Sequence, residues 1–467
     1  MKLAIALIGL LVAVGSAGAA APPGSVPSFR TARDFRTSAK AAQSVAIGDL
    51  DGDGKADLVA AHGADFPVDL RKLRTVSVLL NRGDGRFKPS HPYPTGKEGD
   101  ELGAWSIAIG DLNGDGKLDV ATGNPGAKSV SVLVNSGRGT FEAPVNYALN
   151  REPWDVAIAD LNVDGKLDLA TANPNTVSVL LNRGDGSFGD KVDFPTGRST
   201  WSFAVGDLNG DGKPDIATAN NNGLSTISVL INQGDGSFEP KVDYRTGPGP
   251  RSVAIGDLNN DGKPDVVTAN GTSNPGGDGG WIDSISVLLN KGGGMLRSKR
   301  DYRLEDLEFV SVRIGDLNGD RKPDIAASGA SDDWTITVFV NKGDGTFRAH
   351  YKYGPIPYNG DTVDLGSEAI ALGDLNGDRR LDVVVPKWTK VSVFLNSPGL
   401  CMVQEVRWIK LEAAKRKLAR AHCRVGKVRW GSDPERRGIV YAQRPAAGTV
   451  LPRGGKVNLA VSTGTRS

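Results

Sequence analysis

The 467-residue sequence has few cysteines, few histidines, few aromatic side chains and no long apolar run outside its first residues. A membrane-spanning helix needs about 20 apolar residues in a row, so we expect no transmembrane segment. The four histidines, His62, His91, His350 and His422, do not stand beside a nucleophile motif. We therefore expect no enzyme, with an extracellular, calcium-assisted hydrolase that uses carboxylates as an alternative.

Glycine and aspartate are plentiful instead, and they recur together. The stretch 48–57 reads GDLDGDGKAD, and its seven copies place their first Asp at positions 49, 111, 160, 207, 257, 316 and 374. Acidic or amide side chains fill loop positions 1, 3, 5 and 9 of each copy. This spacing suits calcium, which takes about six to eight oxygen ligands and accepts them from alternate positions of a tight loop.

The sequence therefore predicts up to seven calcium sites, with a backbone carbonyl at position 7. The expected ligands are Asp49, Asp51, Asp53, Lys55, Asp57, Asp111, Asn113, Asp115, Lys117, Asp119, Asp160, Asn162, Asp164, Lys166, Asp168, Asp207, Asn209, Asp211, Lys213, Asp215, Asp257, Asn259, Asp261, Lys263, Asp265, Asp316, Asn318, Asp320, Lys322, Asp324, Asp374, Asn376, Asp378, Arg380 and Asp382. The alternative is a polar turn without metal, since Asp, Asn and Gly favour turns by themselves.

The loops are not those of a helix–loop–helix calcium site. Such a loop closes with Glu at position 12, where the first copy has Ala60. Short β-branched runs flank each loop and predict two strands joined by a hairpin. A third run such as 285–289 and a weaker one such as 238–244 complete a four-stranded unit. Seven such units at intervals of 47–62 residues predict a mainly β protein, a seven-bladed β-propeller.

The two ends of the repeat region complement each other. Residues 28–37 resemble 237–246, whereas no copy of this fourth strand follows 391–396. We expect the N-terminal segment to supply the outer strand of the last blade, which leaves no unpaired edge. An open solenoid is the alternative.

Residues 28–397 resemble FG-GAP/VCBS repeat proteins, the propeller type of integrin α-chain heads and some fungal lectins. The loop motif carries the likeness, and the family implies calcium at the positions given above. Two copies depart from the motif, because Arg321 and Arg379 stand at position 6, where Gly is usual. If position 6 needs a positive φ, these residues are strained, and loops six and seven are the weakest candidates. Val163 at position 4 of the third copy is not a ligand and should matter less.

A candidate ligand face lies opposite the loops. Three consecutive repeats have a Trp six residues before the first loop Asp, the fifth repeat has Arg there, and second strands end near Asn. Aromatic faces beside amides suit sugars; the alternative is that the Trp side chains only pack between blades. The candidates are Trp105, Trp154, Trp201, Arg251, Asn124, Asn173, Asn220 and Asn270.

The first 21 residues begin with Met1-Lys2, continue through an apolar core and end in small residues. This pattern predicts a signal peptide at 1–21 and secretion. In a secreted chain, the two cysteines, Cys401 and Cys423, are expected to form a disulfide.

The C-terminal part has a different composition. Residues 401–467 hold 15 Lys and Arg against 4 Asp and Glu, and one helix at 411–422 stands among four strand-like runs. This small α+β (βαβββ) pattern resembles a PASTA domain over 401–464. The matching motifs are Ala413-Ala-Lys-x-x-Leu418, Gly426-Lys-Val428, Gln443-x-Pro445-x-x-Gly448 and Gly455-x-Val457.

The PASTA family implies contact with peptidoglycan, and the basic charge suits an anionic wall polymer; such a surface can also be merely solvated. The sequence thus favours a bacterial protein, secreted and extracellular or held at the cell wall, whose calcium propeller recognises a glycan or an extracellular protein. We expect no nucleic-acid partner. A purely structural spacer is the other alternative.

Overall fold

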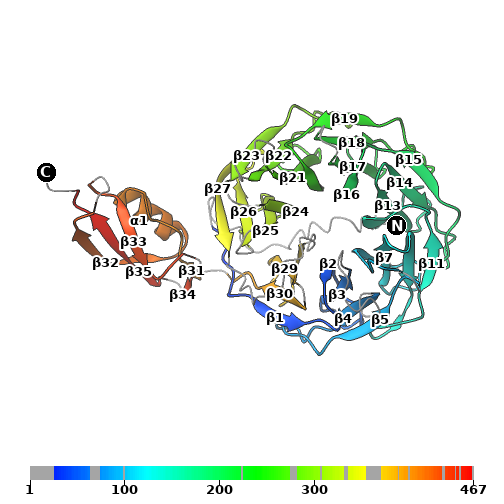
Figure 1. Ribbon diagram of the computed structural model, residues 1–467, viewed down its shortest axis with the longest axis horizontal. Coiled ribbons are helices and arrows are strands. Elements are labelled where there is room, and N and C mark those ends of the chain that lie inside the picture. Colours follow the sequence, from blue (N-terminus) through cyan, green and yellow to red (C-terminus); the bar gives the residue numbers. More distant parts are fainter. Residues whose placement is uncertain are drawn as a thin grey trace.

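A computed structural model describes residues 26–63, 74–97, 100–221, 225–273, 281–304, 308–330, 335–353, 370–387, 389–397, 400–433, 437–447, 449–451 and 454–464. Seven four-stranded antiparallel sheets form a ring, with a small domain beside its rim (Figure 1). This confirms the predicted seven-bladed propeller. The predicted leader 1–21 lies outside the described residues.

In each of the first six blades, the four strands follow chain order from the inner strand at the channel to the outer strand at the rim. Blade one consists of β2 (Ala42–Gly48), β3 (Asp57–His62), β4 (Thr75–Leu79) and β5 (His91–Pro94). Blade two consists of β6 (Ser106–Gly110), β7 (Asp119–Asn124), β8 (Ser129–Leu133) and β11 (Val145–Ala148). Blade three consists of β12 (Asp155–Ala159), β13 (Asp168–Asn173), β14 (Thr176–Leu180) and β15 (Val192–Pro195). Blade two also carries a short hairpin of β9 (Asn135–Gly137) and β10 (Thr140–Phe141).

Blade four consists of β16 (Thr200–Gly206), β17 (Asp215–Asn220), β18 (Thr226–Leu230) and β19 (Val242–Arg245). Blade five consists of β20 (Pro250–Gly256), β21 (Asp265–Ser273), β22 (Trp281–Leu288) and β23 (Arg300–Leu304). Blade six consists of β24 (Glu308–Gly315), β25 (Asp324–Ala330), β26 (Thr335–Asn341) and β27 (Phe347–Tyr353). The outer strand of blade four starts later than the expected 238–244. Phe238 instead forms an isolated bridge with Asn232, which closes the glycine-rich turn before the outer strand begins.

The N-terminal strand closes the ring. Blade seven consists of β28 (Ala371–Gly373), β29 (Asp382–Lys387), β30 (Lys390–Phe394) and β1 (Arg33–Arg36), and β1 pairs antiparallel with β30. The Phe35 ring of β1 then meets Phe87 of blade one edge-on, with centroids 5.0 Å apart. Pairing of segments more than 350 residues apart in sequence thus removes the edge that an open array would leave.

The hydrophobic core is divided among the spaces between neighbouring blades. Between blades two and three, for example, Leu112 and Val132 pack with Ile158 and Leu169, all nearly inaccessible to solvent. Each blade thus buries both faces, which is why its central strands read as continuous apolar runs.

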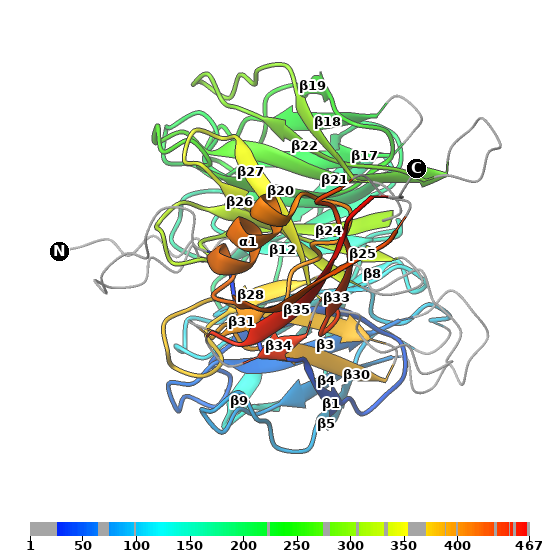
Figure 2. The ribbon, with the colours of Figure 1, turned by 90° about the vertical axis from the view of Figure 1, so that its left-hand side faces the viewer.

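The C-terminal domain contains β31 (Cys401–Met402), α1 (Leu411–Arg420), β32 (Arg424–Gly431), β33 (Val440–Arg444), β34 (Val450–Leu451) and β35 (Lys456–Ser462). Figure 2 shows α1 beside the β-strands of this domain. Its sheet has the order β32-β35-β33, and a separate pair joins β31 to β34. Ala414 and Leu418 of α1 are buried, as the apolar stripe predicts.

Three details differ from the expected βαβββ pattern. A short extra strand, β34, precedes the last one, and the first strand covers only Cys401–Met402, although the strand-like run of the sequence extends over 401–406. The helix ends at Arg420 instead of position 422, because His422 takes a left-handed φ of 55°. The predicted disulfide between Cys401 and Cys423 is present.

Within these described parts of the chain, no helix has the length and apolar character to cross a membrane.

Candidate functional site

Each repeated loop joins the first two strands of a blade and is held by its own carboxylates. In loop one, Asp49 Oδ1 accepts a hydrogen bond from Gly52 N–H at 2.8 Å, and Asp49 Oδ2 accepts one from Gly54 N–H at 2.8 Å. Asp51 Oδ1 accepts from Asp53 N–H at 3.2 Å. The side chains at positions 1 and 3 therefore turn inward, which is the orientation that a bound cation would need.

The Asp at position 9 does more than the sequence indicates. In blade three, Asp168 Oδ2 accepts from Leu161 N–H at 2.9 Å, and Asp168 Oδ1 accepts from Asn182 N–H at 2.8 Å. Burial raises the pKa of Asp168 to about 6, and the charges of Asp164 and Asp160 add to the rise. A nearby cation would lower that pKa again.

A buried asparagine in each glycine-rich turn links neighbouring blades. Asn182 Nδ2 donates to the carbonyl of Leu167 in its own loop at 2.7 Å and to that of Leu112 in the preceding blade's loop at 2.8 Å. The set is Asn81, Asn135, Asn182, Asn232, Asn290, Asn341 and Asn396, and every member makes both kinds of bond. We call these the linking asparagines. Nothing in the sequence distinguishes them from ordinary turn residues.

The fifth loop position differs between the loops. In loops one and two, the position-7 lysine lies 2.6 Å from the position-5 carboxylate, as with Lys55 and Asp53. In loop six, Asp320 is nearly buried, and its Oδ2 has no hydrogen-bond partner among the residues that the structure describes. Burial raises the pKa of Asp320. An orphaned buried carboxylate oxygen beside an Asp and an amide is a donor set that fits a hard cation.

Loop one provides a second test of this fit. One oxygen each from Asp49, Asp51 and Asp57 lies within 4.8 Å of the others. Three carboxylates this close repel one another unless a cation or protons neutralise them. The residues at positions 1, 3, 5 and 9 could therefore hold a divalent cation, and the position-7 carbonyl could complete the set.

Backbone strain falls on position 4 as well as on position 6. Arg321 and Arg379 have φ of 64° and 65°, and they still donate their N–H groups to the first Asp of the loop, as Gly54 does. Val163 at position 4 has φ of 58°. A β-branched residue is strongly disfavoured in the left-handed region, so loop three carries backbone strain as loops six and seven do; the effect of Val163 on metal binding stays a prediction.

The prediction that four asparagine side chains form part of the ligand face is wrong. The side chains concerned are fully buried at the ends of the second strands, and they make internal hydrogen bonds, so they offer nothing to a ligand. The residues are Asn124, Asn173, Asn220 and Asn270, bonded to Ser131, Ser178, Ser228 and Ser286. In blade one, His62 takes the same place and bonds Ser77 at 2.7 Å.

The three tryptophans, by contrast, form one continuous aromatic array. Trp105 meets Trp154 edge-on with ring centroids 5.3 Å apart, and Trp154 stacks on Trp201 at 5.2 Å. Trp105 is buried, whereas Trp154 and Trp201 are half-buried. The array packs blade against blade and leaves Trp154 and Trp201 partly accessible, and contact with a ligand stays a prediction.

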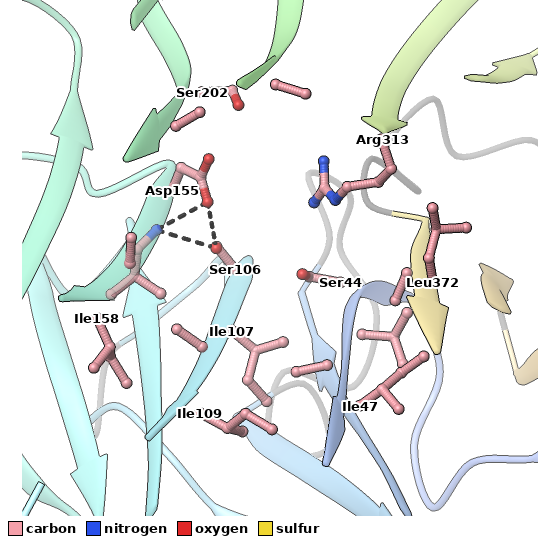
Figure 3. A pocket seen from close by; sticks show the side chains of 18 of the residues that line it. Ser44, Ile47, Ser106, Ile107, Ile109, Asp155, Ile158, Ser202, Arg313 and Leu372 are labelled. Carbon is pink, nitrogen blue, oxygen red and sulfur yellow. Dashed lines mark hydrogen bonds between the residues drawn. The ribbon is translucent and has the colours of Figure 1, made fainter. Parts of the chain in front are cut away.

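The array and Arg251 line a central cavity of about 650 Å³ enclosed by the inner strands of all seven blades. Figure 3 shows its wall, where Asp155 and Arg313 point toward each other from different sides. Asp155 Oδ1 accepts from the Ser106 hydroxyl at 2.8 Å. Asp155 and Arg313 were missed from the sequence, although each interrupts the repeat.

Fold and loops together define a seven-bladed propeller built from one repeat with an aspartate-rich loop. The FG-GAP-like repeat family matches residues 68–122, 111–171, 160–218, 207–268 and 316–385, and the FG-GAP repeat matches 41–68. The protein belongs to the FG-GAP-like repeat family, and residues 403–463 match the PASTA domain. This combination is that of a binding or recognition module, and neither kind of domain is typically catalytic.

Two solved structures illustrate the likeness. BBS1N in its complex with ARL6DN aligns with a TM-score of 0.51 and 12% identity, over 80% of this chain and 98% of that one. A lectin from Agrocybe aegerita that recognises non-reducing terminal N-acetylglucosamine aligns with a TM-score of 0.45 and 22% identity, over 68% of this chain and 80% of its own. At these identities the likeness concerns the fold alone. Comparison with curated proteins finds no matching sequence.

Proposed function

We propose that the protein is a secreted, calcium-stabilised recognition protein whose propeller binds a glycan or an extracellular protein and whose PASTA domain holds the bacterial cell wall. The Trp105–Trp154–Trp201 array carries the propeller part of this proposal. The half-buried, stacked indoles of Trp154 and Trp201, which line the central cavity, provide the flat apolar faces on which sugar rings pack.

Calcium acts as a structural cofactor in this proposal. The inward-facing carboxylates of the loops and the orphaned Asp320 oxygen support it. Because the linking asparagines join each loop to the loop before it, a cation bound in the loops would brace one end of the ring, and the aromatic array at the other end would stay free for a partner.

Two exposed tryptophans and the basic charge support wall binding by the PASTA domain. Trp408 is 59% exposed and Trp430 is 54% exposed. Trp408 also has a left-handed φ of 65°, a strained conformation that is concentrated at functional sites. Lys427 and Arg429 lie on the same strand as Trp430 and are exposed. Aromatic and cationic groups together suit a polymer of sugars and anionic groups.

The test is retention of the mature protein on a glycan array and on purified peptidoglycan, each with calcium and with a chelator. We expect W154L and W201L to lose glycan or protein retention and to keep peptidoglycan retention, and W408A with W430A to do the reverse. V192A, on the exposed outer strand β15, is the matched control.

Unchanged retention of W154L and W201L, with unfolding transitions like that of the wild type, would exclude the array as the recognition surface and favour a spacer. Retention of W408A with W430A on peptidoglycan would remove the wall-binding role of that tryptophan pair.

A further inference from the structure

The channel wall repeats as regularly as the loops do. One ring of inner-strand positions holds Ser44, Ser106, Ser202, Ser252 and Ser311, each at the same pairing register with its second strand. Two residues further on, a second ring holds Ala46, Ala108, Ala157, Ala204, Ala254 and Ala371. Asp155 replaces serine in the first ring, and Arg313 replaces alanine in the second.

The fold does not require the charge of Asp155. The serine hydroxyls accept an N–H from the next blade, as Ser106 does from Val156 at 3.1 Å and Ser252 from Val312 at 3.3 Å. Asp155 Oδ2 accepts from Phe203 N–H at 3.3 Å, which is the same link made by a different acceptor. A serine at this position would keep the blade-to-blade contact.

Nor does the fold require Arg313. Its guanidinium donates to the Val312 carbonyl at 2.8 Å, and a guanidinium has five N–H donors. No ion pair within 4.0 Å joins Arg313 to Asp155 in the part of the chain that the structure describes. The two charges therefore face each other across the cavity, as Figure 3 shows, and most of the donors of Arg313 remain available.

Such an arrangement is unfavourable for an empty scaffold. Asp155 and Arg313 are half-buried, and a charge withdrawn from water is unfavourable unless it is paired and hydrogen-bonded. Burial raises the pKa of Asp155 and lowers the pKa of Arg313, and the attraction between the two only partly offsets this. Five other blades have serine at the Asp155 position and six have alanine at the Arg313 position, so a role in ligand binding explains the charges better than a role in folding.

The rest of the cavity suits a small molecule. Its volume of about 650 Å³ lies within the usual range of ligand sites, about 300–1,000 Å³. The other charged residues of the lining are Arg251 beside the tryptophan array and Asp49 and Asp374 at the loop end. Both of these aspartates already accept backbone N–H groups in their own loops.

We propose that the central channel binds a small zwitterion, with its ammonium group at Asp155 and the Ser106 and Ser202 hydroxyls and its carboxylate at Arg313. A compound that carries both groups, such as a free amino acid or a short peptide, satisfies both half-buried charges at once. The tryptophan array accepts its apolar part. This small-molecule site is additional to the recognition of a polymer or protein proposed above, and it does not depend on that proposal.

The experiment uses isothermal titration calorimetry on the full mature chain. The probes are a panel of free amino acids and dipeptides of both hands, their N-acetylated and C-amidated forms, and uncharged monosaccharides. The variants are D155S, R313A and the double variant. Each substitution restores the residue that the repeat uses elsewhere, so folding is expected to be retained, and a thermal melt checks this.

We expect at least one zwitterion to bind the wild type and its two blocked forms to bind about tenfold or more weakly, since each loses one charge-assisted contact. D155S should weaken the zwitterion but not the N-acetylated form, and R313A should weaken the zwitterion but not the amide. The double variant should lose binding while its unfolding temperature stays equal or rises.

Two results would overturn the proposal. One is that no zwitterion of the panel binds the wild type at millimolar concentration, or that the double variant binds as the wild type does. The other is that only monosaccharides bind. Failure of glycan retention with intact zwitterion binding would refute the proposed polymer recognition alone.

Discussion

The loop end of the propeller and the wall of its channel are built on opposite principles. At the loop end every blade repeats the same contacts: the position-9 Asp accepts two backbone N–H groups, and a linking asparagine reaches the loop of the blade before it. In the channel, Asp155 and Arg313 interrupt the repeat, and the tryptophans occur in only three consecutive blades.

This difference separates the residues that hold the ring of blades together from the residues that are particular to this propeller. Contacts present in all seven blades are needed to hold blade to blade, whereas residues unique to one or a few blades are free to serve a ligand. The predictions below test that division, from the largest expected effect to the smallest.

Calcium should have the largest effect on stability, because it can bind in several loops at once. We expect calcium to raise the free energy of unfolding by about 2.7 kcal/mol for each loop filled at a hundredfold excess over its Kd. Urea unfolding with calcium, magnesium and chelator measures this. An identical midpoint in all three conditions would contradict a calcium role.

The calcium effect should also depend on pH. Burial raises the pKa of Asp57, Asp168, Asp215 and Asp265 to about 6, above the unfolded value. Without metal, these carboxylates stabilise the folded state at acid pH, and that contribution is lost as the pH rises through about 6. Calcium competes with the proton, so its stabilisation should be larger at pH 7.5 than at pH 5.

Removal of one linking asparagine should have the next largest effect. N182A leaves the buried carbonyls of Leu112 and Leu167 without their donor, so we expect a loss of about 2–4 kcal/mol in urea unfolding. Q233A, at an exposed turn position, is the control. A loss no larger than that of Q233A would show that the links between loops are dispensable.

His62 should make blade one sensitive to acid. Burial lowers the pKa of His62 to about 4, whereas the unfolded chain binds the proton near pH 6.5. Stability present above pH 6.5 is therefore lost as the pH falls toward 4, by about 3 kcal/mol.

H62N introduces the residue that the next four blades have at this position. Between pH 6.5 and 4, the free energy of unfolding of the wild type should fall relative to that of H62N. The aspartates contribute equally in both proteins, so this comparison cancels their opposite contribution. A pH-independent difference would mean that the pKa of His62 is the same in the folded and the unfolded chain, and it would contradict this account.

The smallest effect should come from position 4 of the loops. V163G relieves a β-branched residue from a left-handed φ and should stabilise the protein by about 1 kcal/mol. G210V makes the reverse change in blade four, where an added Cβ meets no atom within 4 Å, so backbone strain alone should destabilise it. Shifts of the same sign in the two variants would contradict this account.

Much of the fold could be predicted from the sequence because it is a repeat. The copies of the loop, the β-branched runs around them and the match between 28–37 and 237–246 were enough to predict seven blades closed by the N-terminal strand, and the two cysteines were correctly paired. The outer strand of blade four and the extra strand β34 were not predicted correctly, since short edge strands have weak patterns.

The candidate site was less predictable. Counting positions from the loop correctly placed the tryptophans side by side in neighbouring blades, but it also selected Asn124, Asn173, Asn220 and Asn270, whose side chains face inward to serines. Position in a repeat identifies the blade and the level along the channel. It does not tell which face of a strand end is covered by the next blade.

By itself, the sequence determined the local chemistry of this protein: the spacing of carboxylates on each loop, the number of blades and the pairing of its cysteines, because each follows from residues close together in the sequence or from the number of copies of one motif. Only the tertiary structure decided that Asp155 and Arg313 face each other across one cavity and that Asn182 reaches the loop of another blade. The physical reason is ring closure, which brings together residues from blades far apart in the chain and buries them in contacts that no single repeat contains.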